Sequence, residues 1–310
     1  MSAEARPAPL PCPLCGADAP RLLKRFPDGV AVGRCLPCGF LYTPERHRSP
    51  ETVLAPASLE ALREQYGPVL EGRSHHYRRD HYRAFLDRVG RYVPAGRLLD
   101  VGCAHGFLGR EARARGYAVT GVDPHPGMAA FAREENGLDV LEGTLDAVDL
   151  GERRFDVVMF TDSFDYVLDP VGGLRKVAAA LDPGGVVFVK VPNALSSLLR
   201  LRLERLGIEV GEGAFSPSQR AAHYTRETLA RTLEAAGLVV VEEGFPSPIH
   251  SPTARARREG RAELARRPGE GLPARAARGL LHAAGLLEAS LTGGTNHLAQ
   301  AVYAVARLPK

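Results

Sequence analysis

The 310-residue sequence predicts an α/β protein that carries a small separate module at its N-terminus. Two observations support this prediction. From about residue 95, short runs rich in Val and Leu alternate with amphipathic stretches, which is typical of a parallel sheet covered by helices on both faces. Ahead of that region, four of the five cysteines form two Cys-x2-Cys pairs. A segment this short cannot build its own hydrophobic core.

The composition is that of an ordinary globular protein. Hydrophobic residues make up 45% of the chain and charged residues 25%, which excludes a disordered or fibrous protein. The sequence has no run of 18 apolar residues, and its N-terminus lacks the apolar segment of a secretory signal. We therefore expect a cytoplasmic protein without a membrane partner. Arg greatly outnumbers Lys, which favours a bacterial chain from a GC-rich genome.

The net charge of +4 comes from one segment. Residues 251–280 contain eight Arg and three Glu, a local net charge of +5. The interpretation that fits most such segments is a solvated helical face. If the segment is functional, it would attract an anionic molecule such as a nucleotide-linked sugar, a carrier-bound acid or RNA.

The N-terminal cysteine pairs have the spacing of a zinc ribbon. Each pair forms a turn that points two thiolates at one position about 2.3 Å away, and two turns complete a tetrahedron. Four thiolates leave no open coordination position, so the zinc would be structural. The alternatives are two disulfides, four free thiols or a redox role, and the expected reducing compartment disfavours disulfides. The predicted ligands are Cys12, Cys15, Cys35 and Cys38.

The alternating region predicts a series of strands and helices. The expected strands are 97–101, 117–123, 155–160, 185–191 and 238–243. The expected helices are 106–115, 126–136, 171–181 and 225–236. In parallel sheets, ligands bind at the carboxyl ends of the strands, where the strand order reverses. The loops that follow the first two strands are therefore the first candidates for a binding site.

Those two loops have the chemistry of a nucleoside site. Asp100 ends the first strand and can accept hydrogen bonds from a cationic amine. The small residues Gly102, Ala104 and Gly106 let a ligand approach the backbone closely. Asp123 ends the second strand, where a carboxylate can accept both hydroxyls of a ribose.

Four segments in this region resemble, in order, the motifs of class I S-adenosylmethionine (SAM)-dependent methyltransferases. They are LLDVGCAHGFL, GVDPHPGM, FDVVMFTDSFDYVLDP and LDPGGVVFVKVPN. The resemblance covers about residues 95–243 and resumes in the C-terminal NHLAQAVYAVARLPK. It implies a seven-stranded Rossmann-like sheet whose last strand is antiparallel. A nicotinamide-binding Rossmann domain is the alternative, because Ala104-x-Gly106-x-x-Gly109 approximates its fingerprint without the first glycine.

The resemblance also implies which residues bind SAM. Asp100, Gly102, Ala104 and Gly106 would hold the methionine part of SAM. Asp123 would bind the ribose, and Leu145 and Asp146 would flank the adenine. Thr161 would line the pocket near the sulfonium.

Catalytic residues are harder to assign, because methyl transfer is an in-line displacement that depends mainly on alignment. A general base is needed only where the acceptor must lose a proton. Tyr166 stands where many relatives have His, and a second common His corresponds to about Arg220, with His223 following. Tyr166 and His223 are the candidates for acceptor contact or proton removal. Alternatively, Tyr166 packs beside the cofactor and His223 lies in the first turn of a helix.

We divide the chain into a zinc-binding module over 1–48, a helical linker or lid over 49–94 and a methyltransferase domain over 95–310. Insertions at 193–223 and 245–290 would form an acceptor lid. Four aromatic residues of the linker could cover the active site: His75, His76, Tyr77 and His81.

The sequence therefore predicts a SAM-dependent methyltransferase with a structural zinc that acts on a small-molecule acceptor and releases S-adenosylhomocysteine. The four-cysteine module beside this domain resembles nucleotide-deoxysugar C-methyltransferases and related natural-product enzymes. The acceptor stays open between a sugar, a phenol or quinone-like hydroxyl, and another natural product. The first alternative is an RNA-modifying methyltransferase that uses the zinc module and the Arg-rich segment to bind RNA. The second is a SAM-binding scaffold without activity.

Overall fold

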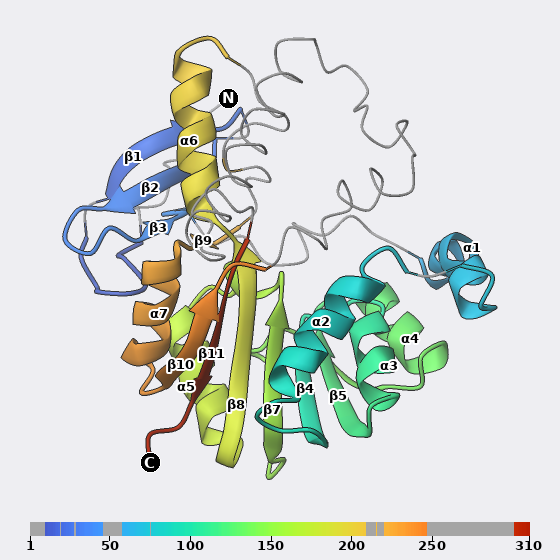
Figure 1. Ribbon diagram of the computed structural model, residues 1–310. Coiled ribbons are helices and arrows are strands. Elements are labelled where there is room, and N and C mark those ends of the chain that lie inside the picture. Colours follow the sequence, from blue (N-terminus) through green and yellow to red (C-terminus); the bar gives the residue numbers. More distant parts are fainter. Residues whose placement is uncertain are drawn as a thin grey trace, which may run out of the picture.

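The computed structural model describes residues 10–18, 20–27, 29–45, 58–74, 76–208, 215, 220–246 and 301–310 (Figure 1). The Arg-rich segment 251–280, nearly all of the expected insertion 245–290 and His75 lie outside these ranges.

A central sheet of seven strands organises the structure, as expected. Its strands are β4 (Gly96–Val101), β5 (Tyr117–Asp123), β6 (Asp139–Glu142), β7 (Phe155–Thr161), β8 (Leu181–Pro192), β10 (Val239–Gly244) and β11 (Ala301–Arg307). They are ordered β10-β11-β8-β7-β4-β5-β6. Strand β11 pairs antiparallel with both neighbours, whereas β4 to β8 run parallel. The predicted antiparallel last strand is therefore confirmed.

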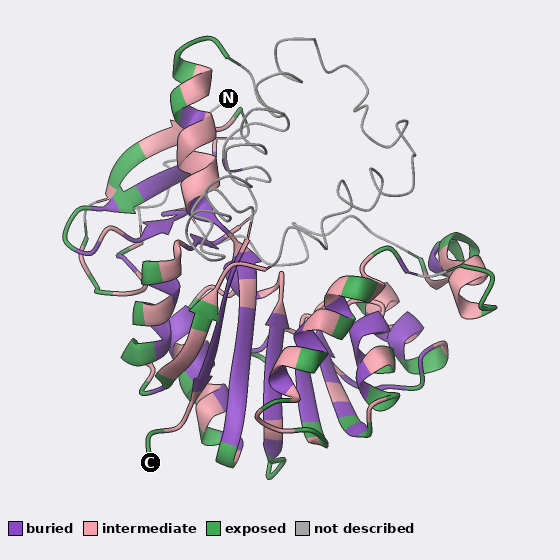
Figure 2. Ribbon diagram, in the orientation of Figure 1, coloured by how far each residue is buried: buried purple, intermediate pink, exposed green. Residues whose placement is uncertain are grey.

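Helices cover both faces of this sheet. One face packs on α2 (Arg79–Val89), α3 (Phe107–Arg113) and α4 (Pro126–Glu134), and the other on α5 (Pro170–Ala179) and α7 (Arg226–Ala235). Helix α1 (Leu59–Leu70) packs against α4. Alternate residues of a strand enter different cores: Leu98 packs with the first group of helices and Leu99 with the second. The sheet is consequently buried along most of its length (Figure 2).

Helix starts follow ordinary capping chemistry. Asp169 accepts the backbone N–H of Gly172 at 2.9 Å, and Pro170 occupies the first turn of α5. Thr225 and Thr228 form a reciprocal capping box at the start of α7. No helix in the described ranges combines the length and apolarity that crossing a membrane requires.

The N-terminal module forms a second, smaller sheet. Its strands are β1 (Pro20–Arg25), β2 (Ala31–Cys35) and β3 (Leu41–Tyr42), and the order is β1-β2-β3-β9. The fourth strand, β9 (Ala222–His223), comes from the end of the expected insertion 193–223. The placement of His223 in the first turn of a helix was wrong, because strand pairing with β3 holds this residue and the helix begins at Arg226.

The same insertion begins with α6 (Ala194–Arg205), which packs on the module. Lys24 of β1 forms an ion pair with Glu204 at 2.9 Å, and Arg205 donates to the backbone oxygen of Leu23 at 3.0 Å. Figure 1 shows the module and α6 together beyond the end of β8. Elements that are far apart in sequence therefore meet at the carboxyl ends of the parallel strands.

Candidate functional site

The loop that follows β4 can only be built with glycine at two positions. Gly102 has a φ of +77°, and a Cβ there would lie 2.4 Å from the Cβ of Ser163. Its N–H donates to the backbone oxygen of Val122 at 2.7 Å. Gly106 also has a φ of +77°, and its Cβ would meet Leu138 at 2.7 Å. Each glycine therefore lets the loop pack directly against a neighbouring side chain of the protein.

The two predicted carboxylates at this edge are held differently. Asp123 accepts the backbone N–H of Ala104 at 2.8 Å and that of His125 at 2.9 Å, one on each oxygen. Asp100 is buried, and its Oδ2 has no hydrogen-bond partner among the described residues. Burial, with the nearby charge of Asp123, raises the pKa of Asp100 to about 7. Burial also raises the pKa of Asp123.

An unpartnered buried carboxylate oxygen is costly, which points to a ligand that donates to it. Asp123 and Thr161 end β5 and β7, and Asp100 is the last residue but one of β4, the strand between them. The hydroxyl oxygen of Thr161 is likewise buried without a partner in the described part of the chain. This set of donors and acceptors fits the ammonium, ribose and sulfonium regions of SAM.

The predicted adenine residues lie in the loop after β6. Leu145 is buried and Asp146 is exposed. Lys176 of α5 donates to the backbone oxygens of Leu145 at 2.7 Å and Asp146 at 3.3 Å, which fixes the path of the loop.

Aromatic rings gather beside the glycine loop. The ring of His76 lies 4.5 Å from that of Phe107 and 5.2 Å from that of His105, and Tyr66 lies 4.6 Å from His105. Burial lowers the pKa of both His76 and His105 to about 4, so both are neutral at pH 7. Of the residues expected to cover the site, His76 joins this cluster.

Of the other residues of the expected cover, Tyr77 lies at the edge of this cluster and His81 packs elsewhere. Tyr77 is 60% exposed, although its ring lies 4.6 Å from that of His76. His81 packs near Phe85 on α2, with the ring centroids 6.3 Å apart. His75 is outside the described residues.

A charged cluster at the end of β7 was not predicted. Asp162 has a φ of +60°, a strained conformation for a residue with a side chain. Its carboxylate forms ion pairs with Lys190 and, at 3.2 Å, with Arg78. Burial alone would raise the pKa of Asp162, but Lys190 and Arg78 outweigh it and lower the pKa. The signal was Lys190 itself, the one charged residue in the apolar strand 185–191.

A second ion pair lies next to this cluster. Asp165, whose side chain is 2% exposed, pairs with Arg220. Burial raises the pKa of Asp165 to about 6, although Arg220 opposes this shift. The Arg220 guanidinium lies 5.9 Å from the ring centroid of Tyr166, which is 36% exposed. Burial raises the pKa of Tyr166, so the phenol is neutral at pH 7.

His223 is buried on β9, with its ring 5.0 Å from that of Phe215. Its Nε2 has no hydrogen-bond partner within the described ranges. Burial, followed by the charge of Arg220, lowers the pKa of His223 to about 3. The imidazole is therefore neutral at pH 7, and it accepts a proton only weakly.

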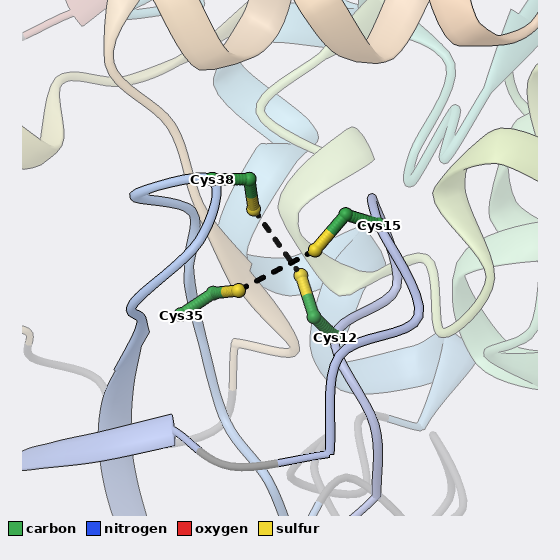
Figure 3. Close-up of side chains that lie close together, drawn as sticks. All are labelled: Cys12, Cys15, Cys35 and Cys38. Carbon is green, nitrogen blue, oxygen red and sulfur yellow. Dashed lines mark hydrogen bonds between the residues drawn. The ribbon is translucent and has the colours of Figure 1, made fainter.

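The four N-terminal cysteines converge on one point (Figure 3). All four sulfur atoms lie within 4.8 Å of one another, with Cys12 and Cys38 at 3.6 Å and Cys15 and Cys35 at 3.4 Å. A tetrahedron with zinc–sulfur bonds of about 2.3 Å has sulfur atoms about 3.8 Å apart, close to these distances. A disulfide requires about 2.05 Å. The donor set therefore fits zinc, and all five cysteines of the chain are free.

A glycine directly after the second cysteine of each Cys-x2-Cys pair forms a tight backbone turn. The N–H of Gly16 donates to the oxygen of Cys12 at 2.8 Å, and that of Gly39 to the oxygen of Cys35 at 2.9 Å. Both glycines have a φ near +75°. Burial raises the pKa of the Cys12 thiol to about 11. A bound cation would reverse that shift, because it favours the thiolate.

A family model described as a methyltransferase domain matches residues 74–243. The chain belongs to this methyltransferase family.

One curated relative is the ubiquinone biosynthesis O-methyltransferase of Methylobacterium sp. (strain 4-46). This chain is 32% identical to it over 155 residues, which cover 47% of this chain and 60% of the relative. This chain is also 36% identical over 118 residues to the protein of that name from Caulobacter vibrioides, covering 36% of this chain and 46% of the relative. The matched part thus spans about half of each relative.

Solved structures with the same type of domain are similar but distant. The CcbJ methyltransferase of Streptomyces caelestis matches with a TM-score of 0.49 at 17% identity, covering 76% of this chain and 97% of that chain. A methyltransferase from Mesorhizobium loti matches with a TM-score of 0.47 at 20% identity, covering 77% and 99%.

Proposed function

We propose that this methyltransferase transfers a methyl group from SAM to a small hydroxylated acceptor of the phenol or quinol class. The observation that supports SAM best is the pair of carboxylates on adjacent strands. Asp123 is oriented by two backbone N–H groups, and Asp100 is buried with one oxygen unpartnered in the described structure. The acceptor class is supported by the relatives named for ubiquinone biosynthesis.

Each site residue has a role in this proposal. Asp100 accepts hydrogen bonds from the ammonium group, Asp123 from the ribose hydroxyls, and the loop through Gly102, Ala104 and Gly106 contacts the methionine part. Leu145 and Asp146 flank the adenine, and Thr161 lines the sulfonium side.

SAM supplies a methyl carbon that is already activated for displacement. The chain's task is to align an acceptor oxygen with it and to keep water away. The rings of Tyr66, His76 and Phe107 beside the glycine loop serve the second purpose. On the acceptor side, Tyr166 contacts the acceptor, and His223 is the candidate that receives a proton. Its low pKa limits it to a weak base.

We also infer that Cys12, Cys15, Cys35 and Cys38 hold a structural zinc. The support is the sulfur geometry together with the fully protein-derived donor set. In the proposed organisation, residues 1–48 form the metal-binding module, 49–94 a helical linker and lid, and 95–310 the methyltransferase domain.

The RNA-modifying alternative is less well supported. Lys24 and Arg25 of the module would be needed for phosphates, but they form ion pairs with Glu204 at 2.9 Å and Glu45 at 3.5 Å. The Arg-rich segment lies outside the described residues. A salt-dependent gel shift with RNA at low ionic strength would favour this alternative over a small acceptor.

Calorimetry with S-adenosylhomocysteine tests the cofactor site. Asp123→Ala should weaken binding by about 2–3 kcal/mol, because it removes a charged acceptor. Asp139→Ala is the matched control, since this exposed carboxylate on β6 lies outside the site and should leave the affinity unchanged. Equal affinities for wild type and Asp123→Ala would contradict the ribose assignment. Methyl transfer from SAM to a panel of catechols and hydroxyquinones, detected by mass, then tests the acceptor class.

A further inference from the structure

The segment Arg220–Tyr224 connects the four-cysteine module to the acceptor side of the site. On the module side, Thr43 Oγ1 donates to the backbone oxygen of Arg220 at 2.6 Å, and Thr43 N–H donates to that of Ala221 at 2.9 Å. Two further residue pairs join β3 to β9 in antiparallel register. The module therefore fixes the backbone of this segment on one edge.

The other edge of the segment is bonded to the methyltransferase domain. Ala221 N–H donates to the backbone oxygen of Asp165 at 2.9 Å. Ala194 N–H, at the start of α6, donates to the oxygen of Tyr224 at 2.8 Å. The segment Arg220–Tyr224 therefore joins β3 of the module to the loops that follow β7 and β8, and we call it the crosspiece.

Three of the four clustered cysteines belong to the same hydrophobic core as this segment. Cys12, Cys35 and Cys38 share one hydrophobic core with Phe40 and Tyr224. The ring of Tyr224 packs edge-to-face on that of Phe40, with the centroids 5.3 Å apart. Arg231 of α7 also donates to the backbone oxygen of Cys38 at 2.9 Å. A displacement of the cysteines is therefore transmitted through Phe40 to Tyr224.

The side chains that the crosspiece presents belong to the acceptor side. Arg220 pairs with the buried Asp165 and lies over Tyr166. Their geometry depends on where the Arg220 backbone is held, because an ion pair with one nearly fully buried partner tolerates little misplacement. The bonds that orient Asp123 lie within the cofactor loops themselves, because they come from the backbone N–H groups of Ala104 and His125.

We propose that the four-cysteine module is the outer support of the acceptor site, and that Thr43 is a positioning residue which transmits the metal-bound geometry to Arg220. Loss of the metal should loosen residues 220–224 while the SAM-binding loops stay ordered. This inference rests on the proposed function for its meaning, but the coupling between metal and crosspiece can be tested without any acceptor.

Hydrogen exchange measured by mass spectrometry on the full chain tests the coupling. Zinc-loaded and chelator-treated proteins are compared with S-adenosylhomocysteine present. Peptides that cover 220–224 should exchange about tenfold faster without metal, and peptides that cover 98–106 and 119–125 should change less than about twofold. Unchanged protection of 220–224 in the metal-free protein overturns the proposal.

A second pair of variants tests the coupling with zinc bound, in case chelation unfolds the chain. Thr43→Val removes the donor to Arg220 and keeps the shape, and should accelerate exchange at 220–224 about fivefold while the zinc content stays unchanged. Thr43→Ser keeps the hydroxyl and should restore protection. Equal exchange in Thr43→Val and wild type refutes the role of Thr43. Failure to bind S-adenosylhomocysteine would instead refute the proposed function and leave the coupling intact.

Discussion

Asp100 and Asp123 lie at the ends of neighbouring parallel strands, yet only Asp123 has both carboxylate oxygens bonded to backbone N–H groups. Oδ2 of Asp100 is buried without a partner among the described residues, and burial raises the pKa of this carboxyl group to about 7. The two acids therefore differ in how they are held. Asp123 is pre-oriented by the backbone, whereas Asp100 keeps one oxygen that a ligand donor could reach.

Cofactor affinity should depend on pH through Asp100. The group must be ionised to accept hydrogen bonds from the ligand's ammonium, and it becomes protonated as the pH falls through about 7. The affinity for S-adenosylhomocysteine should therefore decrease below that value, by about tenfold per pH unit at most. Calorimetry between pH 5.5 and 8.5 measures this slope. Asp100→Asn should bind weakly with no slope, and a wild-type affinity independent of pH would contradict the assignment.

Two glycines with the same backbone conformation should respond differently to alanine. Gly102→Ala places a methyl group 2.4 Å from Ser163, whereas Gly184→Ala at φ +87° meets nothing within 4 Å. Both substitutions carry a conformational cost of about 1 kcal/mol. Gly102→Ala should also reduce the affinity for S-adenosylhomocysteine at least about tenfold, because the loop must shift. If both variants bind equally well, the loop does not contact the cofactor.

Metal analysis should distinguish the four clustered cysteines from Cys103. Wild-type protein purified without added zinc should contain about one zinc per chain. Cys35→Ser removes a buried ligand and should lose the metal and lower the melting temperature. Cys103→Ala, a buried cysteine outside the cluster, should retain the metal. Full zinc content in Cys35→Ser would show that the tetrahedron does not form.

Arg220 should contribute strongly to stability. Arg220→Gln leaves the buried Asp165 unpaired and should lower the free energy of unfolding by about 3 kcal/mol at pH 8. The pKa of Asp165, about 6, lies above its unfolded value, so the carboxyl group is neutral at lower pH. The deficit should therefore shrink as the pH falls through about 6.

Urea unfolding at several pH values measures this dependence. Arg226→Gln is the control, because its ion pair with Glu243 spans 3.5 Å between side chains that are 39% and 35% exposed. This pair should be worth less than about 1 kcal/mol. A deficit in Arg220→Gln that matches this control would mean that Asp165 is stabilised by other groups.

Much of the fold could be predicted because its signals are local. The Val- and Leu-rich runs correspond to β4, β5, β7, β8 and β10, and the helices begin within about two residues of their expected starts. Strand ends likewise place Asp100, Asp123 and Thr161 at one edge without reference to distant residues.

The parts that could not be predicted depend on long-range pairing. Nothing in the two residues of β9 indicates a strand, because the β3 backbone rather than their own pattern holds them there. Arg78 and Asp162 are 84 positions apart in sequence, and Arg220 and Asp165 are likewise far apart. Only Lys190, a charge inside an apolar strand, carried a local signal for this cluster.

The pairing of β3 with β9 has a consequence for synthesis of the chain. Leu41 and His223 are neighbours in the sheet but about 180 residues apart in sequence. All four cysteines leave the ribosome long before β9 does, so the proposed zinc could be captured while the module still has an open edge on β3. That edge is then closed only after the central sheet has been translated through β8. The four-cysteine module is therefore made before the central sheet, yet its own sheet is among the last parts of the described fold to be completed.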